Sequence, residues 1–220
     1  MPPQREGAFL LAIEGGDGAG KATAAAGVVT ALHARGRSAT VISFPRYGDT
    51  VGGQVLGDFL AGRLATPVTP QAAAVLYALD RFESRDHLLE AIAAHDVVVL
   101  DRYIASNIAY QAAKVPAADA PALRDWVLAL ECGQFQLPAA DLQIYLDTPV
   151  AVARDLIARK RRRSYTDRTY DENEADLALQ QRVRDNYAAM AAASLGGRWA
   201  TVPGPPRTPE EVVDGIIALL

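Results

Sequence analysis

The chain has few of the features that would place it outside the cell, in a membrane or on a nucleic acid. Its 220 residues include one cysteine, so it cannot form an internal disulfide. The amino-terminal segment lacks an apolar signal core, and no run approaches the ~18 apolar residues of a membrane span. A formal net charge of -4 gives no basic footprint for nucleic acid over the whole molecule. These absences predict a cytoplasmic protein that binds neither membranes nor nucleic acid.

Metal ligands and reactive thiols are also scarce. The histidines His33, His87 and His95 are far apart and lack the spacing of metal ligands, so we expect them at the surface or at helix ends. Cys132 lies in an apolar segment with helical spacing, which favours a small core residue over a nucleophile. Apolar residues are abundant, at 50% beside 22% charged residues, and this balance is typical of a globular protein.

Apolar runs typical of strands alternate along the chain with segments of helical spacing. A continuous β-branched run such as 96–101 is expected where helices cover both faces of a parallel sheet. The pattern predicts an α/β fold with one doubly wound domain over 1–220, built on a five-stranded parallel sheet flanked by helices. Strands are expected at 8–14, 39–43, 96–101, 142–146 and 199–202. Helices are expected at 20–36, 54–62, 70–93, 104–114, 121–135, 174–194 and from 209 onward.

Two of these helices carry clear start signals. Thr69-Pro70 is an N-cap followed by proline in the first turn, and the large apolar residues that follow it are expected to face inward: Val75, Leu76, Leu79 and Phe82. Thr208 and Glu211 have the spacing of a capping box, which predicts the start of the last helix.

The stretch 15–23 has the spacing of a phosphate-binding loop between a strand and a helix. Glycines allow consecutive backbone N–H groups to point at anionic oxygens, and the helix start adds the positive end of its dipole. Lys21 supplies a mobile positive charge for the outer phosphates. The residues expected to bind a nucleotide triphosphate are Gly15, Gly16, Asp17, Gly18, Ala19, Gly20, Lys21, Ala22 and Thr23.

Two further parts of the sequence carry charged residues that could contact phosphates. Asp101-Arg102 ends a buried strand, where a carboxylate can serve a metal or its water shell and an arginine can hold a second phosphate bidentately. For an isolated pair of this kind, an ion pair at a strand end is the alternative. The stretch 160–173 is dense in charge and lacks an apolar period, so we expect an exposed, mobile loop. Its Arg168 could close on the nucleotide and offset charge on the transferring phosphoryl group.

These motifs together resemble thymidylate kinases, the enzymes that phosphorylate dTMP with ATP, and most of all their actinobacterial branch. The resemblance runs nearly from end to end, and it implies the P-loop kinase fold, a mobile lid at about 160–173, Mg2+ and a homodimer. It rests on five markers in this order: the loop 15–21, Phe44-Pro45-Arg46-Tyr47-Gly48, Leu79-Asp80-Arg81, Asp101-Arg102-Tyr103-Ile104-Ala105-Ser106-Asn107 with Tyr110, and Asp167-Arg168 with Glu174.

The resemblance also implies roles for single residues. Lys21 and the loop backbone hold the ATP phosphates, Arg102 holds the dTMP phosphate, and Arg168 is the lid arginine. Asp17 and Glu174 are the acids near Mg2+. The acceptor pocket consists of Phe44, Tyr47, Tyr77, Arg81, Arg102, Asn107 and Tyr110.

Within that pocket, Tyr77 is implied to stack on thymine, Arg81 and Asn107 to read the ring edge, and Tyr110 to crowd the 2′ position. The helical spacing of Tyr77 alone favours a core aromatic, although Arg81 lies four residues further on the same face.

Two departures from the family pattern stand out. Ala22 replaces the usual hydroxyl ligand of Mg2+, so we expect Asp17 and Glu174 to hold the ion together with waters and substrate phosphate. Tyr77 replaces the commoner phenylalanine. Two other functions stay open at this stage: a kinase for another monophosphate such as dUMP or a ribonucleotide, and a nucleotide-binding regulatory module without turnover.

Overall fold

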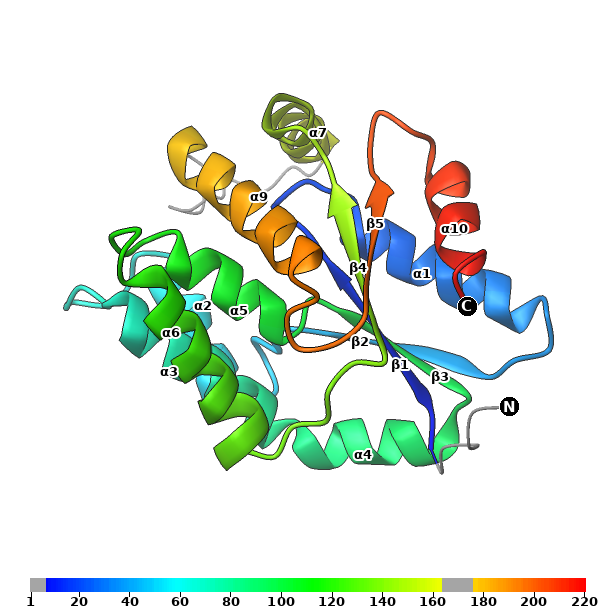
Figure 1. Cartoon of the computed structure of the whole chain (residues 1–220), viewed down its shortest axis with the longest axis horizontal. Coiled ribbons are helices and arrows are strands. Elements are labelled where there is room, and N and C mark those ends of the chain that lie inside the picture. The colour runs from blue at the N-terminus through cyan, green and yellow to red at the C-terminus, as the bar shows by residue number, and fades with distance from the viewer. Residues whose placement is uncertain (1–6, 164–175) are drawn as a thin grey trace.

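The computed structural model of the protein describes residues 7–163 and 176–220, the side chains of 159–163 excepted. Its centre is a sheet of five parallel strands in the order β2-β3-β1-β4-β5, which confirms the predicted α/β fold (Figure 1). Each strand lies within one residue of its expected bounds. In chain order they are β1 (Phe9–Glu14), β2 (Ala39–Ser43), β3 (Val97–Asp101), β4 (Leu142–Asp147) and β5 (Trp199–Pro203).

Alternation along the central strand divides the interior into two cores. Leu10 and Ala12 of β1 point to one face of the sheet, and Leu11 and Ile13 point to the other. Both faces are apolar because helices cover both, as expected for a parallel sheet. The carboxyl ends of the strands therefore form the edge at which a ligand can reach the sheet.

Helices lie on the two faces as a doubly wound fold requires (Figure 1). One core is closed by α1 (Lys21–His33) and α10 (Pro209–Ile217). The opposite core is closed by α4 (Arg85–Ala94), α5 (Ile104–Ala112) and α9 (Leu177–Ala192). Further from the sheet are α2 (Val51–Leu60), α3 (Pro70–Glu83), α6 (Ala120–Leu128) with the π-helical turn η1 (Ala129–Gln134), and α7 (Val150–Arg163).

The expected helix 70–93 is wrong in one respect, because the chain breaks at Ser84 into α3 and α4. The predicted inward face of α3 was wrong for two of its four residues, since Leu76 and Leu79 are partly buried but Val75 and Phe82 are exposed. Val75 and Phe82 are 41% and 46% exposed, and small residues such as Ala74 and Ala78 face the core instead. The reason is close packing between helices: a Cβ on Gly52 of α2 would lie 2.6 Å from the backbone nitrogen of Asp80.

Two further expectations need correction. Cys132 is exposed, not buried, because the π-helical turn η1 directs its neighbour Glu131 inward. The helix α7 continues to Arg163, so the first four residues of the expected loop 160–173 are helical. Arg168, Glu174 and the rest of that loop lie outside the described residues.

The two helix starts that the sequence predicted are confirmed. Thr208 and Glu211 form the predicted capping box of α10, and the Thr69 hydroxyl accepts a hydrogen bond from the backbone of α3. Among the helices of the described ranges, none is long and apolar enough to cross a membrane.

Candidate active site

The glycine-rich loop 15–20 joins β1 to α1 at the carboxyl edge of the sheet. Gly18 and Gly20 have φ angles of 74° and 89°, a region that favours glycine. A Cβ on Gly18 would lie 2.4 Å from the carbonyl oxygen of Ala153 in α7. The loop therefore needs its glycines both for its own conformation and for its contact with α7.

Lys21 is the first residue of α1, and its side chain is only 6% exposed. Its Nζ donates a hydrogen bond of 2.6 Å to the carbonyl oxygen of Gly16, so the ammonium lies across the loop. Burial and the nearby Arg102 lower the pKa of Lys21 to about 7. Anionic phosphates in the loop would reverse this effect, because opposite charge favours the protonated amine.

Ala22 and Thr23 follow in the first turn of α1, and both are exposed. They lie directly after the glycine-rich loop. Ala22 brings no hydroxyl to this position, so a metal at the loop would need carboxylates, water or phosphate oxygens from elsewhere.

Arg102 connects the loop to the neighbouring strand. Parallel pairing sets Asp101 of β3 opposite Ile13 of β1, and the Arg102 backbone N–H donates to the Ile13 carbonyl at 3.1 Å. The residue has a φ of 66°, a left-handed conformation that is uncommon for arginine. Its guanidinium pairs with the Asp17 carboxylate and lies 5.5 Å from the ring centre of Tyr110. An arginine is thus fixed at the junction of two strand ends.

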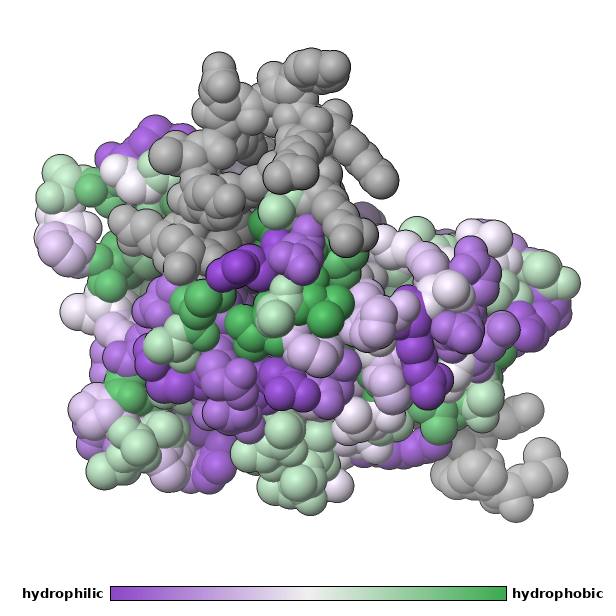
Figure 2. All heavy atoms as spheres, turned by 90° about the horizontal axis from the view of Figure 1, so that it is seen from above, coloured by the Kyte–Doolittle hydropathy of each residue, from purple (hydrophilic) through white to green (hydrophobic). Residues whose placement is uncertain are grey.

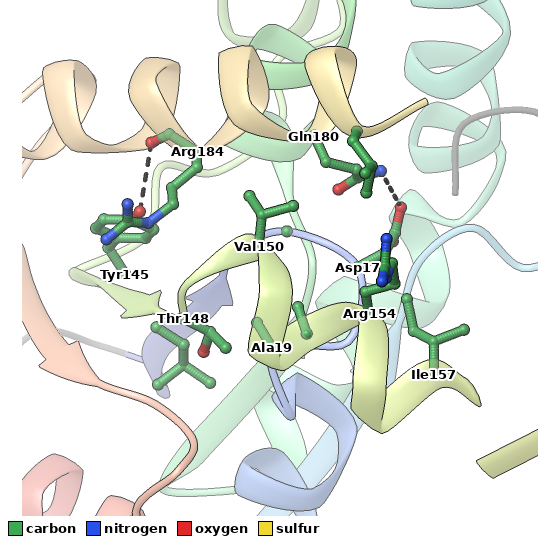
Figure 3. Close-up of a pocket in the computed structure, with 13 residues that line it drawn as sticks. Asp17, Ala19, Tyr145, Thr148, Val150, Arg154, Ile157, Gln180 and Arg184 are labelled. Carbon is green, nitrogen blue, oxygen red and sulfur yellow. Dashed lines mark hydrogen bonds between the residues drawn. The ribbon is translucent and has the colours of Figure 1, made fainter. Parts of the chain in front are cut away.

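Asp17 is held from two sides. In addition to Arg102, the Gln180 side chain from α9 donates to its carboxylate at 3.2 Å, and the two side chains face each other in Figure 3. Burial raises the pKa of Asp17, but the positive charges of Arg102 and Lys21 outweigh it and lower the pKa below its usual value. The side chain is 18% exposed, so an ionised carboxylate is accessible beside the loop.

The predicted acceptor residues meet in one cleft beside the loop. All seven predicted side chains line it, although they come from three separate segments of the chain. The lining consists of Phe44, Tyr47, Tyr77, Arg81, Arg102, Asn107 and Tyr110, with Asp17, Pro45, Leu60 and Ser106.

The turn that carries Phe44 and Tyr47 is fixed by a buried acid. Asp80 of α3 accepts hydrogen bonds from the backbone N–H of Arg46, at 3.1 Å and 3.2 Å, and from the Thr50 hydroxyl at 2.5 Å. Burial raises the pKa of Asp80 despite these bonds. One wall of the cleft is thereby fastened to the helix that carries Tyr77 and Arg81.

Two buried acids of the site were missed by sequence reasoning. Glu131 accepts two hydrogen bonds from the Arg81 guanidinium and one from the Asn107 amide. Glu14 accepts bonds from the Tyr103 backbone, at 2.8 Å, and from the Ser106 hydroxyl, at 2.6 Å. The only signal in the sequence for either residue was an acidic side chain within an apolar segment. That signal does not indicate which residues the acid contacts.

A second hollow adjoins the loop on the side of α7 and α9 (Figure 3). Asp17 lines this hollow as well as the cleft, together with Arg154, Gln180 and Arg184. Arg184 also forms an ion pair of 2.8 Å with Asp147 at the end of β4. Figure 2, which looks onto the carboxyl ends of the strands, shows hydrophilic side chains around a smaller hydrophobic group on this side of the molecule.

A comparison with known proteins identifies the family. The family described as thymidylate kinase matches residues 13–216. The chain belongs to this family. It is 40% identical over 199 residues to the thymidylate kinase of Mycobacterium tuberculosis, an alignment that covers 88% of this chain and 91% of that protein.

Other thymidylate kinases are similar over nearly the same span. The enzyme of Clavibacter sepedonicus is 35% identical over 84% of this chain and 82% of its own length. That of Leifsonia xyli subsp. xyli is 35% identical over 87% of this chain and 85% of its own length. The predicted resemblance to thymidylate kinases is confirmed, and the chemistry of this family is the phosphorylation of dTMP.

Proposed function

We propose that this protein transfers the γ-phosphoryl group of ATP to the 5′-phosphate of dTMP, giving dTDP and ADP. The observation that carries the proposal is the position of Arg102, which is paired with the phosphate-binding loop through Asp17 and also lines the aromatic cleft. An arginine at that junction can hold the acceptor phosphate next to the donor phosphates.

ATP occupies the loop 15–23 in this proposal. The backbone N–H groups and the start of α1 bind the phosphates, and Lys21 leaves the Gly16 carbonyl to bind the outer ones. Protonation of Lys21 accompanies this exchange, since the amine gains anionic partners.

The acceptor dTMP occupies the cleft. Arg102 binds its phosphate, Tyr77 stacks on the thymine, and Arg81 with Asn107 contacts the ring edge. Tyr110 lies against Arg102 and crowds the 2′ position, which disfavours ribose. Phe44 and Tyr47 complete the wall.

Mg2+ fits the accessible acid of the loop. The Asp17 carboxylate is kept ionised and partly exposed, and oxygen ligands of this kind suit the ion. We propose Asp17 and Glu174 as its protein contacts, with Ala22 contributing none. The ion would supply positive charge that offsets the charge of the phosphates.

The mechanism is mainly positioning and charge neutralisation. The acceptor phosphate is already an anion, so no strong general base is needed. Lys21 and Arg102 bring the two phosphates together in line and offset their repulsion. We propose that Arg168 joins them from a lid formed by 160–173, which would also exclude water.

We further propose that the enzyme is a cytoplasmic homodimer. Exposed apolar side chains on α3 and α6 support the dimer, because Val75, Phe82 and Trp126 are 41%, 46% and 40% exposed. Light scattering coupled to size separation should give twice the chain mass, and Phe82→Asp should lower it. A wild-type mass equal to one chain would contradict the dimer.

A coupled assay of ADP release tests the function across dTMP, dUMP, UMP and dCMP. We expect release that depends on the monophosphate and is fastest with dTMP. Faster release with another monophosphate would assign the site to that substrate. Binding of ATP without any release stimulated by a monophosphate would instead indicate a regulatory module.

A further inference from the structure

Beneath the cleft, one buried carboxylate organises the two side chains that face the ring edge of the base. Glu131 is fully buried, and Arg81 and Asn107 are each 2% exposed. The Arg81 guanidinium donates through Nε to Glu131 Oε2 at 2.5 Å and through Nη2 to Oε1 at 2.6 Å. The Asn107 amide nitrogen donates to the same Oε1 at 2.8 Å.

These contacts determine which way the Asn107 amide points. Its nitrogen also donates to the Ala74 carbonyl at 3.0 Å, so both of its polar neighbours are pure acceptors. Turning the amide over would set its oxygen against two acceptor oxygens. The Asn107 Oδ1 atom is therefore directed elsewhere, and it is buried without a hydrogen-bond partner. A buried acceptor of this kind is costly unless a ligand supplies a donor.

Glu131 constrains Arg81 in the same manner. It occupies the Nε–Nη2 edge of the guanidinium, which leaves Nη1 outside this fork. Every guanidinium nitrogen is a donor, so Arg81 can offer only a donor to the base. The pair thus combines one acceptor, Asn107 Oδ1, with one donor, Arg81 Nη1.

We propose that Glu131 is the positioning residue that sets this acceptor–donor polarity and thereby selects thymine over cytosine. Thymine presents an N3–H donor beside its O4 acceptor, which complements the pair. Cytosine presents an N3 acceptor beside an N4 amino donor and opposes it at both places. This inference rests on the proposed function, since it requires dTMP in the cleft.

The substitution Glu131→Gln should weaken this selection. The Glu131 carboxylate accepts from three donors, Arg81 Nε, Arg81 Nη2 and Asn107 Nδ2, whereas a glutamine presents one oxygen and one amino group. Whichever way that glutamine amide turns, at least one donor of Arg81 faces another donor, so the pair is no longer held in place. We expect the ratio of kcat/KM for dTMP to that for dCMP to fall on the order of tenfold or more. The loss should lie in the KM for dTMP and not in kcat.

Two controls separate polarity from general damage. Uracil has the same N3–H and O4 edge as thymine, so the dTMP to dUMP ratio should stay constant in Glu131→Gln. Glu83→Gln makes the same charge change two residues from Arg81, where the glutamine oxygen can still accept from the Gly52 N–H, and all ratios should stay constant. Equal losses for dTMP, dUMP and dCMP in Glu131→Gln would overturn the proposal.

A crystal structure of the wild-type protein with dTMP decides the matter if Glu131→Gln fails to fold. The proposal requires Glu131 to keep its bonds to Arg81 and Asn107, with thymine N3 opposite Asn107 Oδ1. An Arg81 that leaves Glu131, or an Asn107 nitrogen that leaves the Ala74 carbonyl for the base, would overturn it. Wild-type protein that does not phosphorylate dTMP at all would instead contradict the proposed function.

Discussion

The Arg102 guanidinium, at the end of β3, is paired with the Asp17 carboxylate of the phosphate-binding loop. The pair joins the two regions that we assign to acceptor and donor. Arg102 is held there by its backbone bond to Ile13 and its contact with the Tyr110 ring. Its position is therefore set before any nucleotide binds, and this reduces the entropic cost of capturing the acceptor phosphate.

Replacing Arg102 tests that assignment. Arg102→Ala should raise the KM for dTMP on the order of 10–100-fold, because charged hydrogen bonds are each worth about 1.5–3 kcal/mol. The KM for ATP should change much less. Steady-state kinetics with both substrates varied gives the two values. The partly exposed Arg124 of α6 provides the matched variant Arg124→Ala, for which both KM values should stay constant. Unchanged saturation by dTMP in Arg102→Ala would refute the role of Arg102.

Lys21 is expected to act on the transferring group. Lys21→Ala should lower kcat by on the order of 10²-fold or more, as losses of comparable charge stabilisers do. Lys114, whose Nζ lies 5.8 Å from the centre of the Phe59 ring, is not among the residues that line the cleft. It provides the control variant Lys114→Ala, which should keep kcat. The measurement is kcat at saturating ATP and dTMP. A loss in kcat below about tenfold would show that Lys21 does not contact the transferring phosphoryl group.

Proton uptake should accompany ATP binding above neutral pH. With a pKa of about 7, Lys21 is mostly neutral at pH 8 in the nucleotide-free protein, and the phosphates raise that pKa. Titration calorimetry in buffers of different ionisation enthalpy measures the uptake, which should be present at pH 8 and absent at pH 6. Lys21→Arg stays charged at both pH values and corrects for titration of the nucleotide itself. Equal uptake by the wild type and Lys21→Arg would contradict the lowered pKa.

Local patterns were sufficient to predict the strands, the phosphate-binding loop and the place of Arg102 after β3. Each strand is one short apolar run, and the loop 15–21 has its own spacing. The carboxyl ends of parallel strands lie at the same edge of the sheet, so the order of the strands and loops predicts that Arg102 lies near Lys21. The resemblance to a family supplied Tyr77, Arg81 and Asn107, which helical spacing alone does not distinguish from core residues.

The remaining features depend on contacts between distant segments. Glu131 meets Arg81 across 50 positions of the chain, and Glu14 meets Ser106 across 92. No local period predicts such pairs. The face of α3 was only partly predicted, because glycines of α2 let small side chains form the buried contact, while Val75 and Phe82 remain outside.

Glu14 should make stability depend on pH with a defined sign. Burial raises its pKa above the usual 4.5, so the folded protein binds the proton more tightly than the unfolded chain. The stability from protonated Glu14 is present below pH 4.5 and is lost as pH rises through the folded pKa. Glu14→Gln mimics the protonated form, so its unfolding free energy relative to wild type should increase from pH 4.5 to pH 8. Urea titrations at several pH values measure it, and a constant difference would contradict the raised pKa.

Two glycines of α2 offer a matched pair of substitutions. A Cβ on Gly53 would lie 2.2 Å from the Arg46 carbonyl oxygen, whereas one on Gly57 would meet the Tyr47 ring at an ordinary 3.6 Å. Gly53→Ala should destabilise the protein by at least about 1 kcal/mol and raise the KM for dTMP, since it displaces the turn that carries Phe44. Gly57→Ala should stabilise it by about 0.5–1 kcal/mol. Urea unfolding of both variants measures these changes in stability. A Gly53→Ala variant with wild-type stability and a wild-type KM for dTMP would contradict the prediction.

The central claim is that ATP in the loop and dTMP in the cleft react directly with each other. The most direct measurement follows a γ-labelled ATP phosphate in the presence of Mg2+ and dTMP, with nucleotides separated after single and multiple turnovers. The account predicts that the label appears in dTDP, with one dTDP formed for each ADP. Label released as inorganic phosphate, or dTMP recovered unlabelled while ATP persists, would contradict it.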